Sequence, residues 1–459
     1  RCLVPAVIHS GLGAGSRLES WAAARAGRAA LVVGTRSALF TPMPGLGLII
    51  LDEEHDASFK QQDGFRYSAR DIAVKRAAEL DIPILLGSAT PSLESLHNAA
   101  KGRYSWHRLR ERATRAPMPA WRVLDMRQQS TANGLSLQAL EAIGETLQRG
   151  EQVMVFLNRR GYAPVLMCHQ CGWSGTCQRC DAHLTWHRSA SRLVCHHCAS
   201  QRPAPRMCPD CRADALAGAG EGTQQLEEAL ARRFDDVPIL RFDRDKTSRT
   251  GVMDEQLERV RAGGPCLLVG TQMLAKGHHF PEVTLVVIVN IDQALYSADF
   301  RALERMGQMI QQVAGRAGRM EKPGTVILQT LHPDHAALEL LLRQGYEAYA
   351  SWLLQERQMA GLPPAGYQAL LRAEAHERSA AERFLGDAVG IFPAGETRIY
   401  GPMPALMERL GGRSRMYLVV QGASRTALHR QVDQWLPVLR KLPSARKVRW
   451  AVDIDPQNL

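Results

Sequence analysis

Four polar residues, Asp52, Glu53, Glu54 and His55, directly follow the apolar run Leu48–Leu51. The run has the length and composition of a strand buried on both faces, as in a parallel sheet. Open α/β sheets bind ligands at the carboxyl ends of their strands, and an acidic pair there suits magnesium-nucleotide chemistry. We predict that Asp52 holds Mg²⁺ and that Glu53 orients or deprotonates the attacking water. The alternative is a strand that ends in a solvated acidic turn.

Aromatic and cationic side chains alternate in residues 55–71, called the aromatic loop below, which directly follow the acidic residues. Aromatic rings stack on the bases of single-stranded DNA, and cations contact its phosphates. The alternative is that the rings are buried, but Gly64 and the polar run Gln61–Asp63 favour an exposed loop. The DNA contacts predicted in this loop are Phe59, Lys60, Phe65, Arg66 and Tyr67.

Eight of the ten cysteines form four C-x-x-C pairs, and Cys2 and Cys266 stand alone as ordinary thiols. Tetrahedral Zn²⁺ takes four thiolates, so the eight predict two zinc sites. Clustered pairs without a secretory signal indicate metal binding in a reducing compartment rather than disulfides. Redox-active or iron–sulfur cysteines are the alternative, and the spacing leaves the pairing open. The predicted ligands are Cys168, Cys171, Cys177, Cys180, Cys195, Cys198, Cys208 and Cys211.

The length and composition indicate a folded protein of several domains. A chain of 459 residues suggests about three domains, and 45% apolar with 22% charged residues is typical of a soluble protein. The formal net charge of +11 suggests a polyanionic partner, usually nucleic acid, although basic drift produces the same charge. No apolar run reaches membrane-spanning length, so we expect no membrane partner.

Apolar periodicity indicates two α/β lobes followed by a third module. The first lobe has predicted strands at 29–33, 46–51 and 82–86 and a helix at 68–80. The second lobe has predicted strands at 153–157, 239–242, 266–269, 285–289 and 325–328. The predicted ranges are 1–112 for the first lobe, 113–150 for a connector, 151–360 for the second lobe with a cysteine insert at 166–213, and 361–459 for a C-terminal α+β domain that binds DNA or partners.

Two further segments of the second lobe suit phosphate chemistry. The segment Gly270–Gly277 follows a strand, and its glycines and small polar residues let backbone N–H groups approach phosphate. The segment Gln312–Arg319 places Arg316 and Arg319 three residues apart after a helix. Arginine suits the charge that develops on a transferring phosphoryl group, because its fork bonds two oxygens at once.

In this order, after the acidic motif and Ser88–Thr90, these segments make the chain resemble superfamily 2 DNA helicases. The resemblance is closest to the bacterial primosomal replication-restart helicases and covers nearly the whole chain. The segments that carry it are Gly34–Phe40, the cysteine insert, Lys276–Pro281, Ser297–Arg301 and Asp453–Gln457. It implies an α/β fold with two RecA-like helicase lobes with parallel sheets, a zinc-binding insert in the second lobe and a C-terminal α+β domain.

The resemblance also implies roles for single residues. Ser88, Ala89 and Thr90 would couple hydrolysis to lobe movement, and Gln312 would be a catalytic residue near the γ-phosphate. ATP and Mg²⁺ would be bound by Asp52, Glu53, Gly277, Arg316 and Arg319. Arg36, Thr271 and Gln272 would face DNA together with the aromatic loop. One zinc would bind Cys168, Cys171, Cys208 and Cys211, and the other Cys177, Cys180, Cys195 and Cys198.

The activity implied by the resemblance is ATP-driven 3′→5′ DNA unwinding that remodels stalled replication forks and initiates primosome assembly. The implied partners are single-stranded and forked DNA, single-stranded DNA-binding protein, other primosome proteins and the replicative helicase, in the cytoplasm at the nucleoid. No G-x-x-x-x-G-K-[ST] loop occurs in the sequence. We expect this loop to lie before Arg1, so that the chain alone hydrolyses ATP poorly. The alternatives are a zinc-dependent DNA-binding and assembly platform with a secondary motor, and a helicase that acts on RNA.

Overall fold

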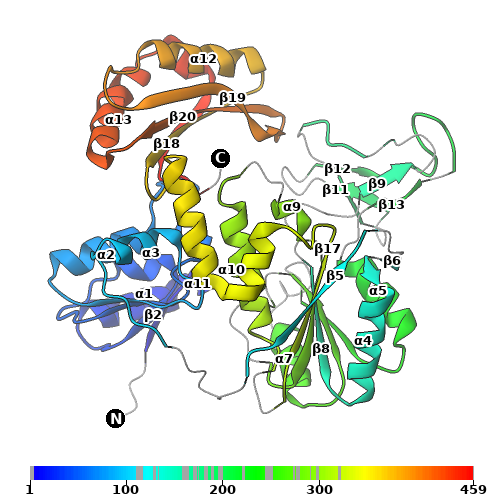
Figure 1. The fold of residues 1–459 in the computed structure, drawn as a ribbon. Coiled ribbons are helices and arrows are strands. Elements are labelled where there is room, and N and C mark those ends of the chain that lie inside the picture. Colours follow the sequence, from blue (N-terminus) through cyan, green and yellow to red (C-terminus); the bar gives the residue numbers. More distant parts are fainter. Residues whose placement is uncertain are drawn as a thin grey trace. The chain divides into compact units, whose positions relative to one another are not determined.

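The computed structural model divides into two compact units, Arg1–Ala100 and Lys101–Leu459 (Figure 1). No helix among the residues that the structure describes is long and apolar enough to cross a membrane. The described residues are 5–109, 117–127, 131–132, 134–157, 165–168, 173, 175–179, 184–187, 191–194, 200–214, 216–219, 223–242, 252–271, 274, 280–289, 291–295, 299–318 and 322–457.

The described part of the first unit, residues 5–100, contains two pairs of parallel strands and three α-helices. Its elements are β1 (Ala6–Ile8), α1 (Ala14–Arg25), β2 (Val32–Gly34), β3 (Ile49–Leu51), α2 (Ala69–Glu79), β4 (Ile84–Leu86) and α3 (Leu93–Ala100), with 3-10 helices at Arg36–Phe40 and Ala57–Phe59. Strand β1 pairs with β2, and β3 pairs with β4. The predicted strands and helix are therefore present, although each strand is shorter than predicted.

Strand β3 differs from the prediction in its burial. Leu51 is buried, but Ile50 is 64% exposed and its neighbour Leu85 on β4 is 53% exposed. Adjacent residues of a strand point to opposite faces of a sheet. The prediction that β3 is buried on both faces was therefore wrong, because the face that carries Ile50 and Leu85 is exposed.

The start of helix α2 determines where the preceding loop ends. Its N-cap residue Ser68 accepts a hydrogen bond from Asp71 N at 3.2 Å, and such a cap stabilises a helix start. Ala73 and Ala77, four residues apart, lie on its buried face. The cap therefore fixes where the preceding loop ends and the helix begins.

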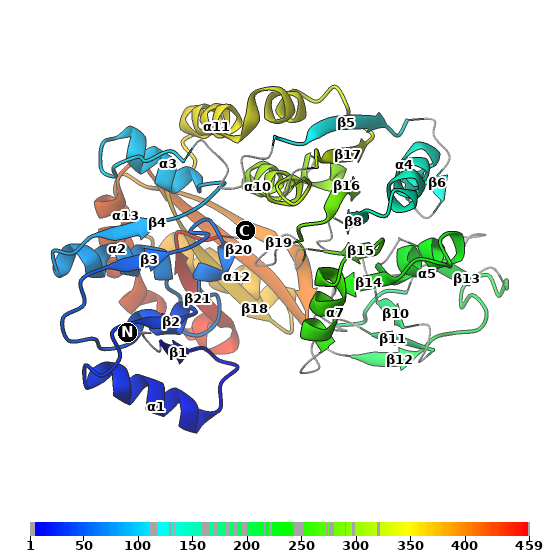
Figure 2. The same cartoon turned by 90° about the horizontal axis from the view of Figure 1, so that it is seen from below.

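The second unit is built on a six-stranded parallel sheet with the order β14-β15-β8-β16-β17-β5. Its strands are β5 (Ala120–Asp125), β8 (Gln152–Leu157), β14 (Ile239–Phe242), β15 (Leu267–Gly270), β16 (Val283–Val289) and β17 (Thr325–Thr330). Helices α4 (Leu137–Gln148) and α5 (Thr223–Arg233) cover one face, and α10 (Ala302–Ala314) lies on the other (Figure 2). The five strands predicted for this lobe are confirmed.

The range 113–150, predicted as a connector, contains elements of this lobe. Strand β5 pairs with β17 from residue 120 to 125, and α4 contributes Leu140, Ile143 and Leu147 to the core of the sheet. Strand β5 was not predicted because Pro117 and Pro119 precede it, and proline next to an apolar segment indicates an irregular connection. Only the pairing with β17, some 200 residues further along the chain, reveals β5 as an edge strand.

The remaining elements around the sheet are short. They are β6 (Thr131–Ala132), β7 (Leu135–Ser136), α7 (Val252–Arg261) and α9 (Asp292–Leu295). The cysteine segment after β8 forms a separate antiparallel sheet with the order β12-β11-β10-β9-β13. Its strands are β9 (Val165–Cys168), β10 (Thr185–His187), β11 (Arg192–Val194), β12 (Gln201–Pro203) and β13 (Leu216–Ala219).

The C-terminal domain is an antiparallel sheet with two helices packed in its core. The strand order is β19-β20-β18-β21, with α12 and α13 in the same hydrophobic cluster. Trp435 and Phe384, both fully buried, bring the two helices together over the sheet. The elements are β18 (Tyr367–Ala375), α12 (Arg378–Gly390), β19 (Arg398–Leu410), β20 (Arg413–Gly422), α13 (Arg425–Leu439) and β21 (Arg449–Ile454), with a 3-10 helix at Pro443–Lys447.

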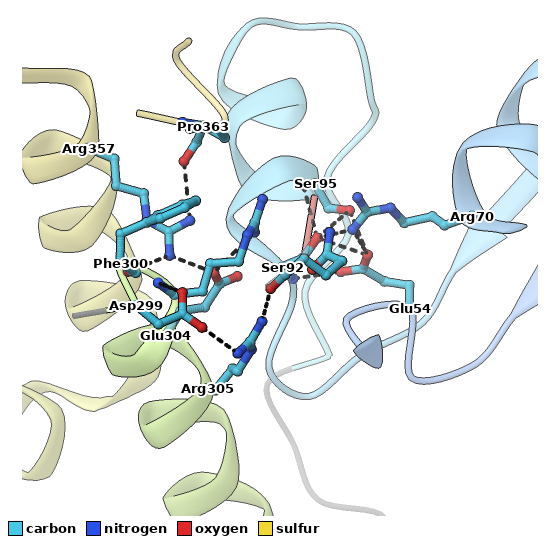
Figure 3. A network of polar contacts seen from close by, with 12 residues as sticks. Glu54, Arg70, Ser92, Ser95, Asp299, Phe300, Glu304, Arg305, Arg357 and Pro363 are labelled. Carbon is cyan, nitrogen blue, oxygen red and sulfur yellow. Dashed lines mark hydrogen bonds and ion pairs between the residues drawn. The ribbon is translucent and has the colours of Figure 1, made fainter. Parts of the chain in front are cut away.

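A buried ion pair joins α10 to the helix that leads into the C-terminal domain, α11 (Ala336–Met359). Arg357, 3% exposed, donates to Glu304 at 2.8 Å and to the Pro363 carbonyl at 3.2 Å (Figure 3). Removing one partner of a buried pair leaves an uncompensated charge, so the contacts of Arg357 hold the start of the C-terminal domain against α10. At the start of α10, Arg305 pairs with Asp299 at 2.8 Å.

Candidate nucleotide site, metal centre and DNA-contacting loop

The acidic residues form a tight turn at the carboxyl end of β3. Asp52 Oδ1 accepts a hydrogen bond from Glu53 N at 2.9 Å, and Glu53 has a left-handed φ of 49°. Backbone bonds extend the pairing of β3 and β4, since Gly87 N donates to Leu51 O at 2.8 Å and Gly87 O accepts from Glu54 N at 3.1 Å. A left-handed non-glycine residue costs free energy and often marks a functional turn. The turn leaves the Asp52 side chain exposed.

His55 connects this turn to the segment after β4. Its Nδ1 atom lies 2.7 Å from Ser88 Oγ and 3.5 Å from a carboxylate oxygen of Glu53. Ser88 Oγ also accepts a hydrogen bond from Thr90 N at 2.9 Å. His55 therefore connects the acidic pair to the segment Ser88–Thr90.

Glu54 has no role predicted from the sequence, yet its carboxylate lies at the centre of a network of polar contacts with Arg70, Ser92 and Ser95 (Figure 3). It is 2% exposed. Oε1 accepts from Ser92 N at 2.7 Å, and Oε2 accepts from Ser92 Oγ at 3.0 Å and Ser95 Oγ at 2.9 Å. Arg70 Nη1 completes the set at 3.2 Å. Only the tertiary structure shows that Glu54 is buried.

Arg70 remains charged in this setting. Burial acts to lower its pKa, but the carboxylates of Glu94, Asp71 and Glu54 outweigh that effect and hold the pKa of Arg70 above its ordinary value. Its Nη1 atom also donates to Ser92 Oγ at 2.7 Å. The guanidinium thus compensates the buried negative charge of Glu54.

Backbone hydrogen bonds join the two ends of the aromatic loop at its base, whereas its tip is exposed. Lys60 and Ser68 form an isolated antiparallel bridge, and Gln61 N donates to Tyr67 O at 2.8 Å. At the tip, Phe65 is 80% exposed and its ring centroid lies 6.0 Å from that of Tyr67. An exposed ring beside a half-buried one provides a surface on which bases can stack.

Two of the predicted DNA-contacting cations lie at the base of this loop rather than at its tip. Lys60 is 7% exposed, and Arg36 Nη1 donates to the Lys60 carbonyl at 2.9 Å. Tyr67 packs edge-on against Phe40, with ring centroids 5.2 Å apart. Arg66 and Phe59 are half-buried. Among the DNA contacts predicted in this loop, Phe65 is therefore the exposed side chain, and the others are buried or half-buried.

The predicted phosphate-contacting residues of the second unit lie at the end of α10. Gln312 is half-buried on the last turn, and Arg316, 7% exposed, follows the C-cap residue Gly315. Gly318 has a φ of 63°, and a Cβ there would lie 2.4 Å from Gly324 N, so only glycine fits. Thr271 follows β15 directly. The predictions for Gln272, Gly277 and Arg319 lie outside the described residues.

Three cysteines of the insert form a cluster suited to a metal ion. The sulfur atoms of Cys168, Cys208 and Cys211 all lie within 4.8 Å of one another, and those of Cys168 and Cys211 are 3.6 Å apart. Zn–S bonds of about 2.3 Å in a tetrahedron place sulfur atoms about 3.8 Å apart, so the cluster fits Zn²⁺. Cys177 Sγ accepts a hydrogen bond from Arg179 N at 3.3 Å. Cys171, Cys180, Cys195 and Cys198 lie outside the described residues.

Comparison with known protein families identifies three segments of the chain. Residues 358–457 match the model of the primosomal protein N C-terminal domain. Residues 177–203 match the PriA DNA helicase Cys-rich region, and residues 220–321 match the helicase conserved C-terminal domain. These matches cover the C-terminal sheet, part of the cysteine insert and the strands β14, β15 and β16 of the six-stranded sheet.

Curated relatives match over almost the whole chain. The replication restart protein PriA of Haemophilus influenzae is 47% identical over 99% of this chain and 62% of its own length. PriA of Bacillus subtilis is 38% identical over 98% of this chain and 57% of its own length. PriA of Treponema pallidum is 34% identical over 99% of this chain and 69% of its own length. The chain thus spans about three fifths of the first two relatives.

Parallel sheets, a helicase C-terminal domain and a cysteine-rich insert define an α/β protein of the helicase class, as predicted. Within that class, the chain belongs to the PriA family of replication restart proteins.

Proposed function

We propose that the intact protein is an ATP-driven DNA helicase that unwinds DNA with 3′→5′ polarity. The observation that carries this proposal is the turn at the end of β3, in which Asp52, Glu53 and His55 meet Ser88. An exposed carboxylate, a second carboxylate beside it and a link to the neighbouring strand end are among the parts that a nucleotide-driven motor needs.

Each residue of this turn has a distinct proposed task. Asp52 holds Mg²⁺, and Glu53 orients the attacking water and takes its proton. Mg²⁺ supplies charge neutralisation for the β- and γ-phosphate oxygens of ATP. Arg316 contacts the transferring phosphoryl group, assisted by Gln312 and Arg319. Gly277 approaches the nucleotide through its backbone.

The proposed DNA contacts are divided between the two units. In the first unit, Phe65 stacks on bases, Tyr67 and Phe59 extend that surface, and Lys60, Arg66 and Arg36 support it electrostatically. In the second unit, Thr271 and Gln272 face the DNA strand. The basic net charge of +11 favours a polyanionic partner and supports this assignment.

We further propose two nested zinc sites in the insert. The proximity of Cys168, Cys208 and Cys211 supports a site completed by Cys171. The second site then consists of Cys177, Cys180, Cys195 and Cys198. A closed four-thiolate site is structural rather than catalytic, so zinc holds this small sheet together.

The biological role that we propose is the restart of stalled replication. In this role the protein remodels forked DNA, meets single-stranded DNA-binding protein, and initiates primosome assembly that loads the replicative helicase. The names of the relatives support the restart role. The family match of residues 358–457 supports the proposal that the C-terminal domain takes part in that role.

The decisive experiment compares the intact wild-type protein with Glu53→Gln. Both proteins are titrated with single-stranded DNA and with forked duplexes, while ATP hydrolysis and strand separation are measured. We expect DNA-stimulated hydrolysis and 3′→5′ unwinding in the wild type, and a loss of both with retained DNA binding in the variant. A wild-type protein that binds DNA but neither hydrolyses ATP in response to it nor separates strands would instead favour the zinc-dependent DNA-binding and assembly platform. Single-stranded RNA is titrated in parallel, and stronger stimulation by RNA than by DNA would favour the helicase that acts on RNA.

A further inference from the structure

Two segments that carry the resemblance to helicases, Ser297–Arg301 and Asp453–Gln457, have no task in the proposed function, yet they are joined in the structure. Arg305 on α10 provides the link. Its Nη1 atom donates to Asp299 Oδ2 at 2.8 Å (Figure 3). Its Nη2 atom donates to the carbonyl oxygen of Gln457, which is 152 positions further along the chain. One guanidinium therefore connects the segment before α10 to the segment after β21.

The segment after β21 is itself attached to the C-terminal domain. Asp455 N donates to Gln368 O on β18 at 2.9 Å, and the Asp455 carboxylate accepts from Arg425 Nη2 on α13 at 3.1 Å. Pro456 is buried, and its ring restricts the backbone to a narrow range of φ. The Gln457 carbonyl therefore has a defined position relative to this domain.

Helix α11 holds the first half of α10 as well. The hydroxyl of Tyr349 on α11 donates to Leu303 O at 2.7 Å, and Arg357 donates to Glu304 at 2.8 Å. A Cβ on Gly307 would lie 2.3 Å from Tyr349 Cε1, so the two helices approach more closely than a side chain would allow. The first half of α10 is thus fixed to the C-terminal domain and to the helix that leads into it.

The opposite end of α10 carries the residues proposed to contact the nucleotide. Gln312 comes seven residues after Arg305, so the two lie on one face of the helix, about 10 Å apart along its axis. Arg316 follows the C-cap residue Gly315. Because α10 is one continuous hydrogen-bonded helix, a displacement of its first turn displaces its last turn as well. A misplacement of about 1 Å at a reacting centre can cost about 100-fold in rate.

We propose that Arg305 is a positioning residue that fastens α10 to the segment after β21 and thereby places Arg316 against the transferring phosphoryl group of ATP. This inference rests on the proposed function and adds to it a residue that does not touch the nucleotide. Because the task proposed for Arg316 is to stabilise charge in the transition state, a loss of Arg305 lowers kcat and leaves KM for ATP nearly unchanged.

Three variants of the intact protein separate this role from a general effect on folding. Arg305→Lys keeps the positive charge but loses the fork that reaches Asp299 and Gln457 at once. A protein shortened to end at Asp455 loses the carbonyl that Arg305 contacts, and it retains the backbone N–H and side chain of Asp455. A protein shortened to end at Gln457 retains that carbonyl group and is the matched control.

The test measures kcat and KM for ATP at saturating single-stranded DNA, together with melting temperature and hydrogen exchange of residues 312–318. For Arg305→Lys and the protein that ends at Asp455, we expect kcat to fall by about 10- to 100-fold with KM nearly unchanged. We also expect faster exchange of residues 312–318 and a melting temperature close to that of the wild type. The protein that ends at Gln457 should match the wild type in all four measurements.

A double variant tests whether Arg305 acts through Arg316. The residual hydrolysis of Arg316→Ala is followed in single-turnover reactions, and adding Arg305→Lys should lower it no further, because the positioned group is already absent. A further loss in the double variant would overturn the inference.

Other results would contradict the inference directly. They are a wild-type kcat in Arg305→Lys or in the protein that ends at Asp455, a raised KM in place of a lowered kcat, and an equal loss in the protein that ends at Gln457. With Arg316→Ala inactive, each of these results leaves the proposed role of Arg316 intact. Normal hydrolysis by Arg316→Ala would instead overturn that role, and the positioning role of Arg305 with it.

Discussion

The Nδ1 atom of His55 lies 2.7 Å from the hydroxyl oxygen of Ser88, although the two residues are 33 positions apart in the chain. They meet because β3 and β4 are parallel neighbours whose carboxyl ends lie at one edge. His55 follows the acidic pair and Ser88 begins the segment that continues to Thr90. The contact is therefore a direct side-chain link between the two segments.

We predict that Ser88→Ala lowers the rate of DNA unwinding more than the rate of ATP hydrolysis, because it removes the hydroxyl that contacts both His55 and Thr90. A double-mutant cycle with His55→Ala should give a coupling of about 0.5–3 kcal/mol, as for other residues in contact. Unwinding and hydrolysis rates provide the measurement, and exposed Ser379→Ala on α12 is the control. Strictly additive effects of the two changes would contradict the prediction.

We predict two Zn²⁺ per chain, held by the eight cysteines of the insert. Elemental analysis of the purified protein should count two ions, and Cys208→Ser should lower the count to one. Cys266→Ser is the control and should retain both, because Cys266 lies outside the insert. A count of one or none in the unaltered protein, with thiols that titrate freely in the folded state, would refute the claim.

Arg316→Ala should abolish DNA-stimulated hydrolysis in the intact protein while DNA binding is nearly unchanged. An arginine that stabilises transition-state charge is worth about 10³-fold or more in rate. Because Arg316 is 7% exposed, melting temperature must be measured in parallel, and Arg316→Lys serves as a second variant that keeps the charge. Arg343→Ala, at an exposed surface pair, is the control. Normal hydrolysis in folded Arg316→Ala would make this arginine structural or DNA-facing.

Phe65→Ala should weaken binding of single-stranded DNA without lowering the melting temperature. The ring is 80% exposed, so its removal leaves no cavity, while stacking on one base contributes about 1–3 kcal/mol. Phe65→Trp should retain affinity, because it keeps an aromatic face. Tyr67→Ala should instead reduce stability, since Tyr67 packs on Phe40. Reduced melting with unaltered DNA affinity in Phe65→Ala would defeat the proposed contact.

Cys266 should resist alkylation at neutral pH in the folded protein. The thiol is 6% exposed, and burial raises the pKa of Cys266 from 9.0 to about 11. Since the raised pKa means that the folded state holds this proton more tightly, the associated stability is complete below pH 9 and is lost between pH 9 and 11. Mass spectrometry after iodoacetamide treatment, compared with urea-unfolded protein, provides the measurement. Rapid labelling of the folded protein at pH 7 would contradict this expectation.

Much of the architecture and the chemistry could be predicted from local patterns. The five strands of the second lobe are visible as apolar runs, and α2 is visible from its apolar spacing. The acidic pair could be predicted because charge directly after an apolar strand is a feature of a few adjacent letters. The cysteine pairs could be predicted because zinc chemistry requires specific atoms at short spacing.

Other features depended on contacts between distant segments. Proline-flanked β5 becomes a strand only through its pairing with β17, and Ile50 is exposed because burial depends on what covers each face of β3. Glu54 reads as one more acidic residue in a row of four polar residues, and nothing in its neighbours reveals that it is buried.

The sequence by itself determined which chemical groups the chain can offer, since carboxylates, guanidinium groups and thiols come with the residue type. Tertiary structure alone decided which of these groups are exposed, supported or linked. Glu54 became a buried partner of Arg70 because β3, α2 and α3 bring residues 54, 70, 92 and 95 together. Burial then makes the unpaired charge costly, and that cost, which no local pattern of residues records, ties the three segments to one another.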